Sequence, residues 1–470
     1  MHTKIICTLG PATDDPGILR ELIENGMNVA RFNFSHGTHE EQLKRYKQLI
    51  NLREELGVPV ATLLDTKGPE IRLGLFENGG AHLKSGETFT LTTQDCLGTV
   101  ERVSISYGDL PLDVETGGMI LLDDGKIALR VESVTATDII CTVLNDGRVA
   151  DKKGVNVPGA KLSMPFVSEK DYDDIIFAAR EGFDFVAASF TRTADDIKEV
   201  RMLLNWNGGQ KTKIIAKIEN MQGVENIDKI IDISDGVMIA RGDLGVEVPL
   251  EEVPVIQKDI IRKVAIQGKT VITATQMLES MMNYPRPTRA EATDVANSIY
   301  DGTTAIMLSG ETAVGKYPIE TLKTMARLAE RTERDINYRK RFKESEFHCD
   351  DSITHAISNA ACAAAMGLEA KAVVAFTLSG RTAQAISAFR SGTRIIACTT
   401  CERVFQQLAI TWGVSPFMVT DHDTLDEMFE KGLQALVDAG MLEAGDIVVL
   451  TAGVPIGVSG STNFIKVTRV

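Results

Sequence analysis

The 470-residue sequence lacks the marks of a secreted, membrane-spanning or fibrous protein. Its seven cysteines are odd in number and scattered, so they do not make a disulfide framework and favour a reducing compartment. No apolar run approaches the roughly 18 residues of a membrane span, and Pro11 interrupts the N-terminus before the apolar core of a signal peptide could form. Glycine and proline usage is that of ordinary globular chains. We therefore expect a cytoplasmic protein without a membrane partner.

Positive charge is also in short supply. Lysine and arginine number 50 against 65 aspartates and glutamates, which gives a net charge of −15. A field of this sign repels phosphate, so a nucleic-acid partner is not expected, and a small anionic ligand would need a local basic pocket. The seven histidines show no clustered ligand spacing, which argues against zinc.

The most regular feature that is present is a series of short, nearly continuous apolar runs rich in β-formers. Runs of this kind are typical of strands buried on both faces, as in a parallel sheet. Segments of helical length, such as 17–25 and 193–206, lie between most of them. Eight strands alternating with helices predict a (β/α)8 TIM barrel, although periodicity alone also fits an open doubly wound sheet. The runs are residues 3–9, 27–34, 58–65, 183–190, 213–219, 235–241, 269–275 and 303–309.

Two other textures divide the chain. Residues 69–162 are rich in glycine and threonine with alternating apolar positions, which predicts a small antiparallel β lid inserted at the catalytic end of the barrel. The charged stretch 338–351 reads as a linker, and strand and helix patterns resume after it. The predicted domains are a barrel over 1–68 and 163–337, an inserted β domain over 69–162, and a C-terminal α/β domain over 348–470.

Polar side chains collect where the predicted barrel strands end. Any single strand turns polar when it reaches solvent, but in a barrel these ends converge on one face, the usual place of an active site. Five ends in succession carrying groups useful to chemistry favour a functional face. These ends are residues 31–35, 65–67, 217–220, 241–243 and 275–276.

Three of these ends carry the acids and cations of a plausible reaction centre. Glu219 and Asp243 follow adjacent strands, and two converging carboxylates suit a hard divalent cation such as Mg²⁺. Lys217 lies two residues before Glu219, so both point to one side of a strand. The lysine could neutralise a transferring phosphoryl group or an enolate, or could form a Schiff base. Arg31 suits phosphate binding. The side-chain oxygens of Asn33 and Ser35, which follow it, suit either a monovalent cation or the capping of a turn.

Three further motifs outside this face are less specific. Residues 310–316 imitate a phosphate-binding loop, but Tyr317 stands where a serine or threonine is required. Cys398 and Cys401 form a single CxxC pair, which we interpret as incidental. Residues 377–382 follow a strand and open a helix, so they fit either a phosphate site or a capped turn.

Eight motifs occur in the order seen in pyruvate kinases, and the chain resembles that family over nearly its whole length. The resemblance implies a barrel, an inserted lid and a C-terminal regulatory domain. It also implies phosphoryl transfer from phosphoenolpyruvate to ADP, giving pyruvate and ATP in the last step of glycolysis. The motifs are TKIICTLGP, RFNFSHG, LLDTKGPEIR, KKGVNVPG, IAKIEN, ARGDLGVE, ITATQMLESM and PRPTRAEATDVAN.

The resemblance also implies roles for the residues at the predicted strand ends. Lys217 would stabilise the transition state, and Arg31 would contact the phosphoryl group of phosphoenolpyruvate. Glu219 and Asp243 would hold Mg²⁺ or Mn²⁺. Thr275 would act through ordered water in protonating the enolate. The substrate carboxylate would be bound by the backbone amides of Gly242 and Asp243 and by the Thr275 side chain.

A K⁺ ion and the nucleotide have their own implied residues. Family members that depend on K⁺ have glutamate at the position of Glu70, so K⁺ dependence is implied here. The K⁺ ligands would be Asn33, Ser35, Asp65 and the backbone carbonyl of Thr66. The nucleotide would be bound by Asn33, Arg72 and Lys153.

The implied effector site lies in the C-terminal domain. Its loop would comprise Thr377, Ser379, Gly380, Arg381 and Thr382, with residues 453–461 as a partner loop. Fructose 1,6-bisphosphate, AMP and another sugar phosphate stay open as the activator. The family is usually homotetrameric, and the alanine-rich segment 357–367 fits either a subunit contact or ordinary core packing.

Two rival functions stay open at this stage. A Mg²⁺-dependent lyase or aldolase acting on pyruvate enolate would share the predicted carboxylates but would not need Arg72 or the lysine of the lid. A non-catalytic phosphate sensor would not need an intact set of Lys217, Glu219, Asp243 and Thr275.

Overall fold

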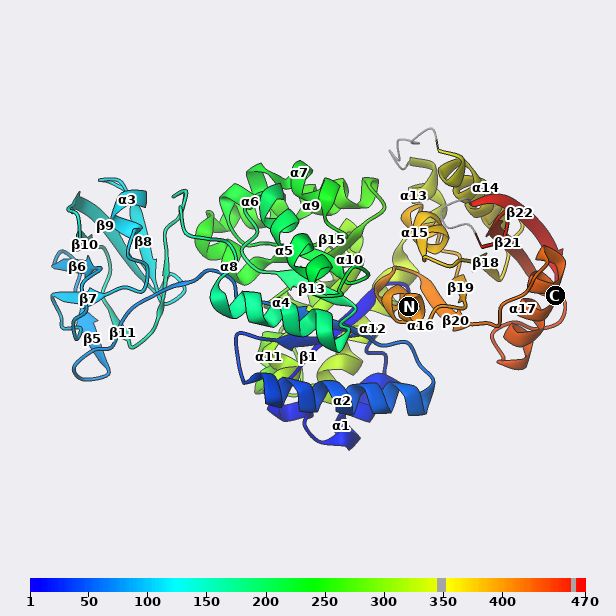
Figure 1. Cartoon of the computed structure of the whole chain (residues 1–470), viewed down its shortest axis with the longest axis horizontal. Helices are drawn as coiled ribbons and strands as arrows, with labels where there is room; N and C mark the ends of the chain where they lie inside the picture. Colours follow the sequence, from blue (N-terminus) through cyan, green and yellow to red (C-terminus); the bar gives the residue numbers. More distant parts are fainter. Residues whose placement is uncertain (345–351, 458–461) are drawn as a thin grey trace.

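The computed structural model describes residues 1–344, 352–457 and 462–470 and arranges them around a barrel and two further groups of strands. The barrel lies in the middle of the elongated molecule, the inserted strands lie at one end, and the C-terminal sheet lies at the other (Figure 1). The described residues contain no helix that is both long and apolar enough to cross a membrane. Each of the six described cysteines is a free thiol.

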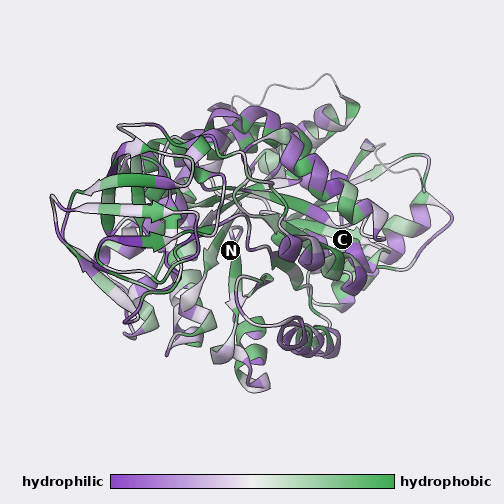
Figure 2. Ribbon diagram, turned by 60° about the vertical axis from the view of Figure 1, so that its left-hand side comes forward, coloured by the Kyte–Doolittle hydropathy of each residue, from purple (hydrophilic) through white to green (hydrophobic). Residues whose placement is uncertain are grey.

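The eight predicted strands form a closed, all-parallel barrel. One face of each strand packs inside the barrel and the other packs against the surrounding helices, which explains the nearly continuous apolar runs. Hydrophobic strands run through the centre of the molecule, while the helices around them carry hydrophilic outer faces (Figure 2). The strands are β1 (Lys4–Leu9), β2 (Val29–Asn33), β3 (Ala61–Asp65), β13 (Phe185–Ala188), β14 (Lys213–Ile218), β15 (Gly236–Ala240), β16 (Thr270–Ala274) and β17 (Ala305–Leu308).

The helices around the barrel begin and end at recognisable signals. Thr38, Thr193 and Thr288 each form a capping box at a helix start, which satisfies backbone N–H groups that the helix cannot. Gly57 and Gly182 end two helices in the left-handed conformation that glycine tolerates. The principal helices are α1 (Pro16–Glu24), α2 (His39–Leu56), α4 (Glu169–Glu181), α5 (Ala194–Trp206), α7 (Ile227–Ile233), α8 (Arg241–Glu247), α9 (Val253–Ile266), α10 (Arg289–Asp301) and α12 (Pro318–Asp335).

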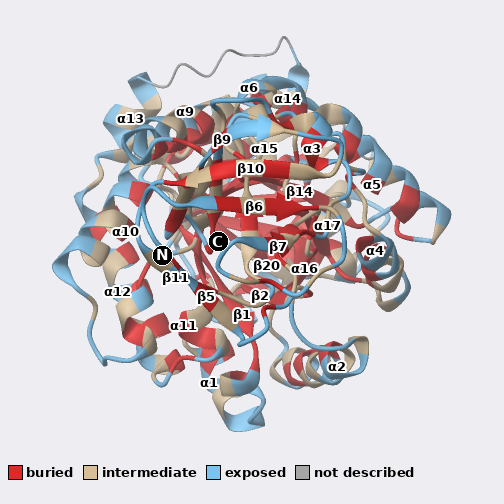
Figure 3. Cartoon of the chain, turned by 90° about the vertical axis from the view of Figure 1, so that its left-hand side faces the viewer, coloured by how far each residue is buried: buried red, intermediate tan, exposed pale blue. Residues whose placement is uncertain are grey.

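The chain between β3 and β13 forms a separate group of short strands with its own apolar core. Seven strands make one sheet, and an antiparallel bridge between Leu73 and Ile105 joins its two edges into a small barrel-like unit. Figure 3 shows this sheet from its own side, with the largely buried strands β10 and β6 in view and exposed connections around them. In sheet order the strands are β4 (Ile71–Arg72), β12 (Gly154–Asn156), β8 (Met119–Leu122), β9 (Ile127–Val134), β10 (Asp138–Val143), β6 (Thr88–Thr92) and β7 (Arg102–Ser104), and a separate pair joins β11 (Gly147–Ala150) with β5 (Gly80–Leu83).

The C-terminal part is a five-stranded sheet with helices on both faces and an apolar core on each side. Its first four strands in sheet order are parallel, and the last is antiparallel to its neighbour. The strands in sheet order are β20 (Val414–Met418), β19 (Ile395–Thr399), β18 (Ala372–Phe376), β21 (Ile447–Gly453) and β22 (Thr462–Arg469), and the helices are α14 (Ile353–Gly367), α15 (Arg381–Ala388), α16 (Glu402–Gln407) and α17 (Leu425–Asp438).

The C-terminal domain closes the amino end of the barrel. Ala409 and Ile410 belong to the same apolar cluster as the residues inside the barrel. Arg403 donates to the backbone carbonyl of Phe183, and Gln407 donates to that of Asp184. The carboxyl end of the barrel is therefore left to face the inserted strands.

One expectation about the connection between the two domains is wrong. The first half of the predicted linker is a helix, α13 (Tyr338–Glu344), because its side chains have partners. Arg341 donates to the carbonyl of Tyr300, and Phe342 packs against the C-terminal core. The second half of this stretch, from residue 345 to 351, lies outside the described residues, as does the predicted start of the C-terminal domain at residue 348. The exact domain boundaries stay a prediction.

Candidate active site

Arg31, Asp65 and Thr8 form a buried polar group at the carboxyl ends of three neighbouring strands. Arg31 Nε donates to Asp65 Oδ2 at 2.6 Å, and Arg31 Nη1 donates to Thr8 Oγ1 at 2.9 Å. Burial raises the pKa of Asp65, but Arg31 and Lys217 outweigh it and hold that pKa below its usual range. The guanidinium group is therefore fixed beside an ionised carboxylate, in a geometry suited to a phosphoryl oxygen.

Lys217 is the most heavily partnered cation of this face. Its ammonium group lies 3.0 Å from Asp65 Oδ1 and 3.0 Å from Glu219 Oε1, and it donates to Ser189 Oγ at 2.7 Å. Burial lowers the pKa of Lys217, but Asp65 and Glu219 outweigh burial and raise it. The lysine is thus held charged, which suits electrostatic stabilisation and opposes the neutral amine that a Schiff base requires.

Glu219 and Asp243 meet at the ends of β14 and β15, where their carboxyl groups contact each other. Burial raises the pKa of both, and each is opposed by Lys217. A buried carboxylate, Glu219, in contact with the half-buried Asp243 disfavours a second negative charge, so a bound cation would relieve the pair. No group of three or more metal-ligating side chains is present among the described residues. The pair fits Mg²⁺, which takes one or two carboxylates plus water and substrate oxygens.

Gly242 and Thr275, predicted to bind the substrate carboxylate, lie next to each other. The Gly242 amide belongs to the first turn of α8 and donates to Thr275 Oγ1 at 2.7 Å. Thr275 has a φ of +69°, which a β-branched residue rarely adopts. Arg241 holds this backbone in place, because Nη2 donates to the Thr275 carbonyl at 2.8 Å while Nη1 lies 2.7 Å from Asp294.

The predicted K⁺ ligands gather at the ends of β2 and β3. Asn33 and Asp65 are paired directly across these strands. Asn33 Oδ1 accepts from the Ser35 amide at 3.0 Å, and the Thr66 carbonyl accepts from Ser189 Oγ at 2.6 Å. Amide, carboxylate, hydroxyl and carbonyl oxygens thus lie within one short stretch of the barrel rim, a donor set of the kind that a hard monovalent cation takes.

Two of the three predicted nucleotide residues, Arg72 and Lys153, lie on the inserted domain and line a cavity of about 300 Å³ that Asp243 also lines. The third, Asn33, ends β2 of the barrel and does not line this cavity. Glu70 pairs with Arg72 at 2.6 Å and lies 3.5 Å from the Lys67 ammonium group. Lys153 pairs with Asp123 at 2.9 Å. The structure therefore brings Arg72 and Lys153 to the same cavity as one of the two metal-binding candidates.

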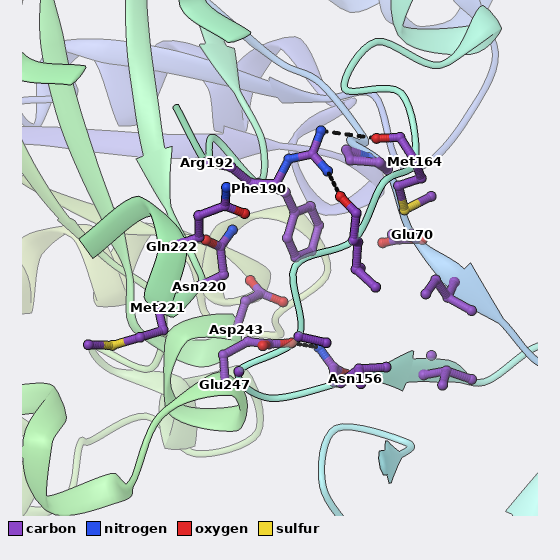
Figure 4. A pocket seen from close by; sticks show the side chains of 18 of the residues that line it. Glu70, Asn156, Met164, Phe190, Arg192, Asn220, Met221, Gln222, Asp243 and Glu247 are labelled. Carbon is purple, nitrogen blue, oxygen red and sulfur yellow. Dashed lines mark hydrogen bonds between the residues drawn. The ribbon is translucent and has the colours of Figure 1, made fainter. Parts of the chain in front are cut away.

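Two contacts connect the walls of this cavity (Figure 4). Arg192, from the barrel side, donates to the carbonyls of Leu162 and Met164, where the chain returns from the inserted strands. Asn156 of the inserted domain donates to Glu247 of α8 at 2.8 Å. These contacts set the position of the inserted domain above the barrel.

The predicted effector residues separate into two places. Thr377, Ser379 and Thr382 line a cavity at the carboxyl ends of the C-terminal strands, and Gly380 begins α15 with a φ of +81°. Arg381 does not line that cavity and instead faces a cleft between α15 and the barrel. Residues 458–461 of the predicted partner loop lie outside the described residues.

Several residues of the site were not predicted from the sequence. Thr8, Ser189 and Arg241 hold Arg31, Lys217 and Thr275 respectively. The Phe190 amide donates to Glu219 Oε2 at 2.5 Å, and Phe190 has a φ of +55°. Ser189 and Phe190 end the run 183–190, the same signal that located the other strand ends.

Comparisons with known proteins agree with this arrangement. The family described as pyruvate kinase, barrel domain, matches residues 1–322, and that described as pyruvate kinase, alpha/beta domain, matches residues 355–468. A pyruvate kinase of Geobacillus stearothermophilus is 50% identical over 467 residues, covering 99% of this chain and 80% of the relative. One of Clostridium acetobutylicum is 48% identical over 466 residues, covering 99% of this chain and 98% of the relative.

A solved structure shows the same architecture. The crystal structure of a pyruvate kinase from Cryptosporidium parvum superimposes with a TM-score of 0.95 at 38% sequence identity, covering 100% of this chain and 96% of that one. Both family matches and the similarity to these relatives agree with the geometry of the candidate site at the carboxyl end of the barrel. The chain belongs to the pyruvate kinase family and is a phosphotransferase.

Proposed function

We propose that this pyruvate kinase transfers the phosphoryl group of phosphoenolpyruvate to ADP at the carboxyl end of the barrel, with Mg²⁺ (or Mn²⁺) and K⁺ as cofactors. The observation that carries the proposal is the Lys217 ammonium group, held between Asp65, Glu219 and Ser189. Phosphoryl transfer needs positioned positive charge more than covalent help, and this lysine provides it in a buried site.

The chain's own residues divide the work. Arg31 and Lys217 hold the phosphoryl group, and Lys217 stabilises the enolate that the transfer leaves. The Gly242 and Asp243 amides and the Thr275 hydroxyl bind the carboxylate of phosphoenolpyruvate, which orients the reacting end. Thr275, acting through water, lies on the route of the proton to the enolate carbon.

The cofactor residues complete the charge balance. Glu219 and Asp243 would hold Mg²⁺, and Asn33, Ser35, Asp65 and the Thr66 carbonyl would hold K⁺. When bound, the two ions supply positive charge where the phosphoryl group passes between the substrates. On the inserted domain, Arg72 and Lys153 would bind the nucleotide phosphates together with Asn33, and closure of this domain would exclude water from the reaction.

The same proposal covers the finer features implied by the family. The protein would work in the cytoplasm as a homotetramer and would be activated by a phosphorylated metabolite bound at the loop of Thr377, Ser379, Gly380 and Thr382, with Arg381 facing the neighbouring cleft. Fructose 1,6-bisphosphate, AMP and another sugar phosphate are the candidate activators.

The cofactor proposal is tested by initial rates of pyruvate formation with Mg²⁺ or K⁺ omitted in turn. We expect each omission to lower the rate strongly, and we expect Glu70→Lys to reduce the dependence on K⁺. Glu24→Lys on α1 changes the charge equally, far from the site, and is the control. Equal rates with and without K⁺ in the unmodified protein would refute the K⁺ assignment.

A further inference from the structure

The loop that follows strand β13, residues 189–192, lies between the reaction centre and the inserted domain. Its first two residues face the barrel mouth, where Ser189 Oγ accepts from Lys217 at 2.7 Å and the Phe190 amide donates to Glu219 Oε2 at 2.5 Å. Its last residue, Arg192, reaches toward the chain that returns from the inserted domain (Figure 4). One short loop therefore contacts both the reaction centre and the connection to the inserted domain.

Arg192 holds the return segment, residues 161–166, by its backbone. Its Nη1 donates to the carbonyl of Leu162 at 3.0 Å, and its Nη2 donates to that of Met164 at 3.1 Å. The guanidinium group also lies 6.0 Å from the centre of the Phe166 ring. A planar fork that binds two carbonyls fixes the direction of a segment as well as its position. Arg192 therefore sets the course by which the chain re-enters the barrel.

The outgoing segment, residues 66–70, rests against the same loop. A side chain at Gly68 would have no room, because its Cβ would lie 2.7 Å from the Phe190 ring and 2.8 Å from Ser189 Cβ. Asp171, buried in the first turn of α4, accepts from the amides of Lys67 and Gly68 at 3.0 Å and 3.1 Å. Both connections of the inserted domain thus meet the 189–192 loop.

The backbone of this loop is strained and is held from several sides. Phe190 has a φ of +55°, which residues with a side chain rarely adopt. The amides of Arg192 and Thr193 donate to Asp196 Oδ2 at 2.8 Å and 2.9 Å, and Asn226 donates to the Arg192 carbonyl at 3.1 Å. A strained conformation persists only where its surroundings hold it. A displacement of Arg192 would therefore reach the Phe190 amide, two residues away.

We propose that Arg192 is a positioning residue that, through the 189–192 loop, couples the placement of the inserted domain to the alignment of Glu219 and Lys217. The inference rests on the proposed function and adds a control to the same site. While Arg192 holds the return segment, the Phe190 amide and the Ser189 hydroxyl hold these two side chains. When the segment moves, the loop carries the displacement to them. The inserted domain would thus act on the metal site as well as covering it.

Binding of Mn²⁺ to the full-length protein without substrates tests the coupling, with electron paramagnetic resonance as the readout. We expect Arg192→Met to bind Mn²⁺ about threefold to tenfold more weakly, since residues that orient metal ligands from outside the site commonly change affinity at least this much. Loss of a positive charge alone would strengthen the binding of a cation, so a weaker affinity reports alignment. Arg192→Lys, which cannot reach both carbonyls, should give an intermediate affinity.

Three control variants isolate the effect. Glu219→Gln should remove the measured binding, which places the bound ion at the predicted metal site. Arg201→Met is the matched control, because Arg201 is also half-buried, donates to the Thr212 carbonyl at 2.7 Å and pairs with Asp235, yet lies away from the inserted domain. Lys198→Met removes one positive charge from the exposed face of α5. Arg201→Met and Lys198→Met should bind Mn²⁺ as the unmodified protein does.

The turnover of the same variants gives a second readout. We expect Arg192→Met to lower kcat by about tenfold with a smaller change in the KM for phosphoenolpyruvate, because misalignment slows the chemical step more than it weakens binding. Melting temperatures check that each variant is folded. If Arg192→Met does not fold, the milder Arg192→Lys carries the test.

Three outcomes would overturn the coupling. An Mn²⁺ affinity in folded Arg192→Met and Arg192→Lys equal to that of the unmodified protein would leave Arg192 as a support of the inserted domain alone and would leave the proposed function intact. Equal weakening in Arg201→Met would assign the effect to a general loosening of the barrel. Binding that Glu219→Gln leaves unchanged would contradict the metal assignment of the proposed function, and the coupling with it.

Discussion

Strand β14 carries a lysine near each end, one buried and one half-buried, and the two lysines lie in opposite surroundings. Near the carboxyl end, Lys217 lies 3.0 Å from each of two carboxylates and donates to Ser189. Four residues earlier, at the amino end, Lys213 faces Arg381 and an aspartate that is engaged elsewhere. The pKa of Lys217 is raised, whereas burial lowers that of Lys213.

The difference indicates what each end of the barrel is organised to do. At the carboxyl end, the protein itself neutralises the buried charges and fixes their positions, as electrostatic catalysis requires. At the amino end, Lys213 and Arg381 line a cleft between the barrel and the C-terminal domain and form no ion pair among the described residues. The following predictions test each half of this comparison, from the largest effect to the smallest.

Lys217→Met should have the largest effect. We expect the rate of pyruvate formation to fall by about a thousandfold or more, because the change removes the positive charge from the reaction centre. The measurement is kcat with saturating phosphoenolpyruvate and ADP, and the circular dichroism spectrum checks the fold. Lys198→Met is the matched control, and near-normal turnover of Lys217→Met would refute the role given to this lysine.

Ser189→Ala tests whether pairing at the carboxyl end fixes the position of Lys217. Without the hydroxyl, Lys217 loses one acceptor and the Thr66 carbonyl loses a donor. We expect kcat to fall by about tenfold to a hundredfold with a smaller change in KM, because a small misplacement of a reacting group slows the reaction more than it weakens binding. Ser298→Ala removes a buried serine bonded only within α10 and should keep full activity. An unchanged kcat in Ser189→Ala would show that two carboxylates suffice to hold the lysine.

Arg241→Lys should have a smaller effect at the same end. A lysine cannot reach both the Thr275 carbonyl and Asp294 as the arginine fork does, so the positive-φ backbone of Thr275 would relax. We expect the KM for phosphoenolpyruvate to rise about threefold to tenfold, reflecting weaker carboxylate binding. Arg262→Lys on α9, which forms an exposed pair with Asp259, is the control. A KM equal to that of the control would separate Arg241 from substrate binding.

His2 gives the smallest effect, and it lies at the amino end. Its ring stacks on Trp412 at 4.6 Å, and burial lowers its pKa from 6.5 to about 4. Between these values the unfolded chain binds a proton that the folded chain does not, so stability falls as the pH falls through that window. His2→Phe keeps an aromatic ring but cannot titrate.

The difference in stability between the unmodified protein and His2→Phe, followed over pH, measures this effect. We expect unmodified protein to lose about 1–3 kcal/mol more stability than His2→Phe on acidification through the window. Melting temperatures at successive pH values provide the readout. Parallel curves for the two proteins would show that the ring of His2 titrates normally in the folded state.

The barrel could be predicted from the sequence because burial on both faces leaves a local pattern. Each of the eight apolar runs contains one barrel strand, and Lys217 and Glu219 meet as their spacing requires. The helix α13 was missed because its partners, including the Tyr300 carbonyl, come from distant segments. Charge alone cannot distinguish a solvated linker from a helix that packs.

The support for the site was harder to predict than its main residues. Lys217 and Asp243 stand at strand ends with charged side chains, whereas Ser189 resembles any serine at a turn until Lys217 is seen to donate to it. The interdomain cleft left no signal in the sequence. Lys213 and Arg381 are far apart along the chain, and only the docking of α15 against the barrel brings them together.

Phosphorus NMR of the unmodified protein with phosphoenolpyruvate, ADP, Mg²⁺ and K⁺ tests the central claim most directly. If Lys217 and its partners promote phosphoryl transfer, the phosphoryl signal will move from phosphoenolpyruvate to ATP, with one pyruvate formed for each ATP. Release of inorganic phosphate without ATP, or no turnover by the folded protein, would contradict the account and return weight to a lyase or a phosphate sensor.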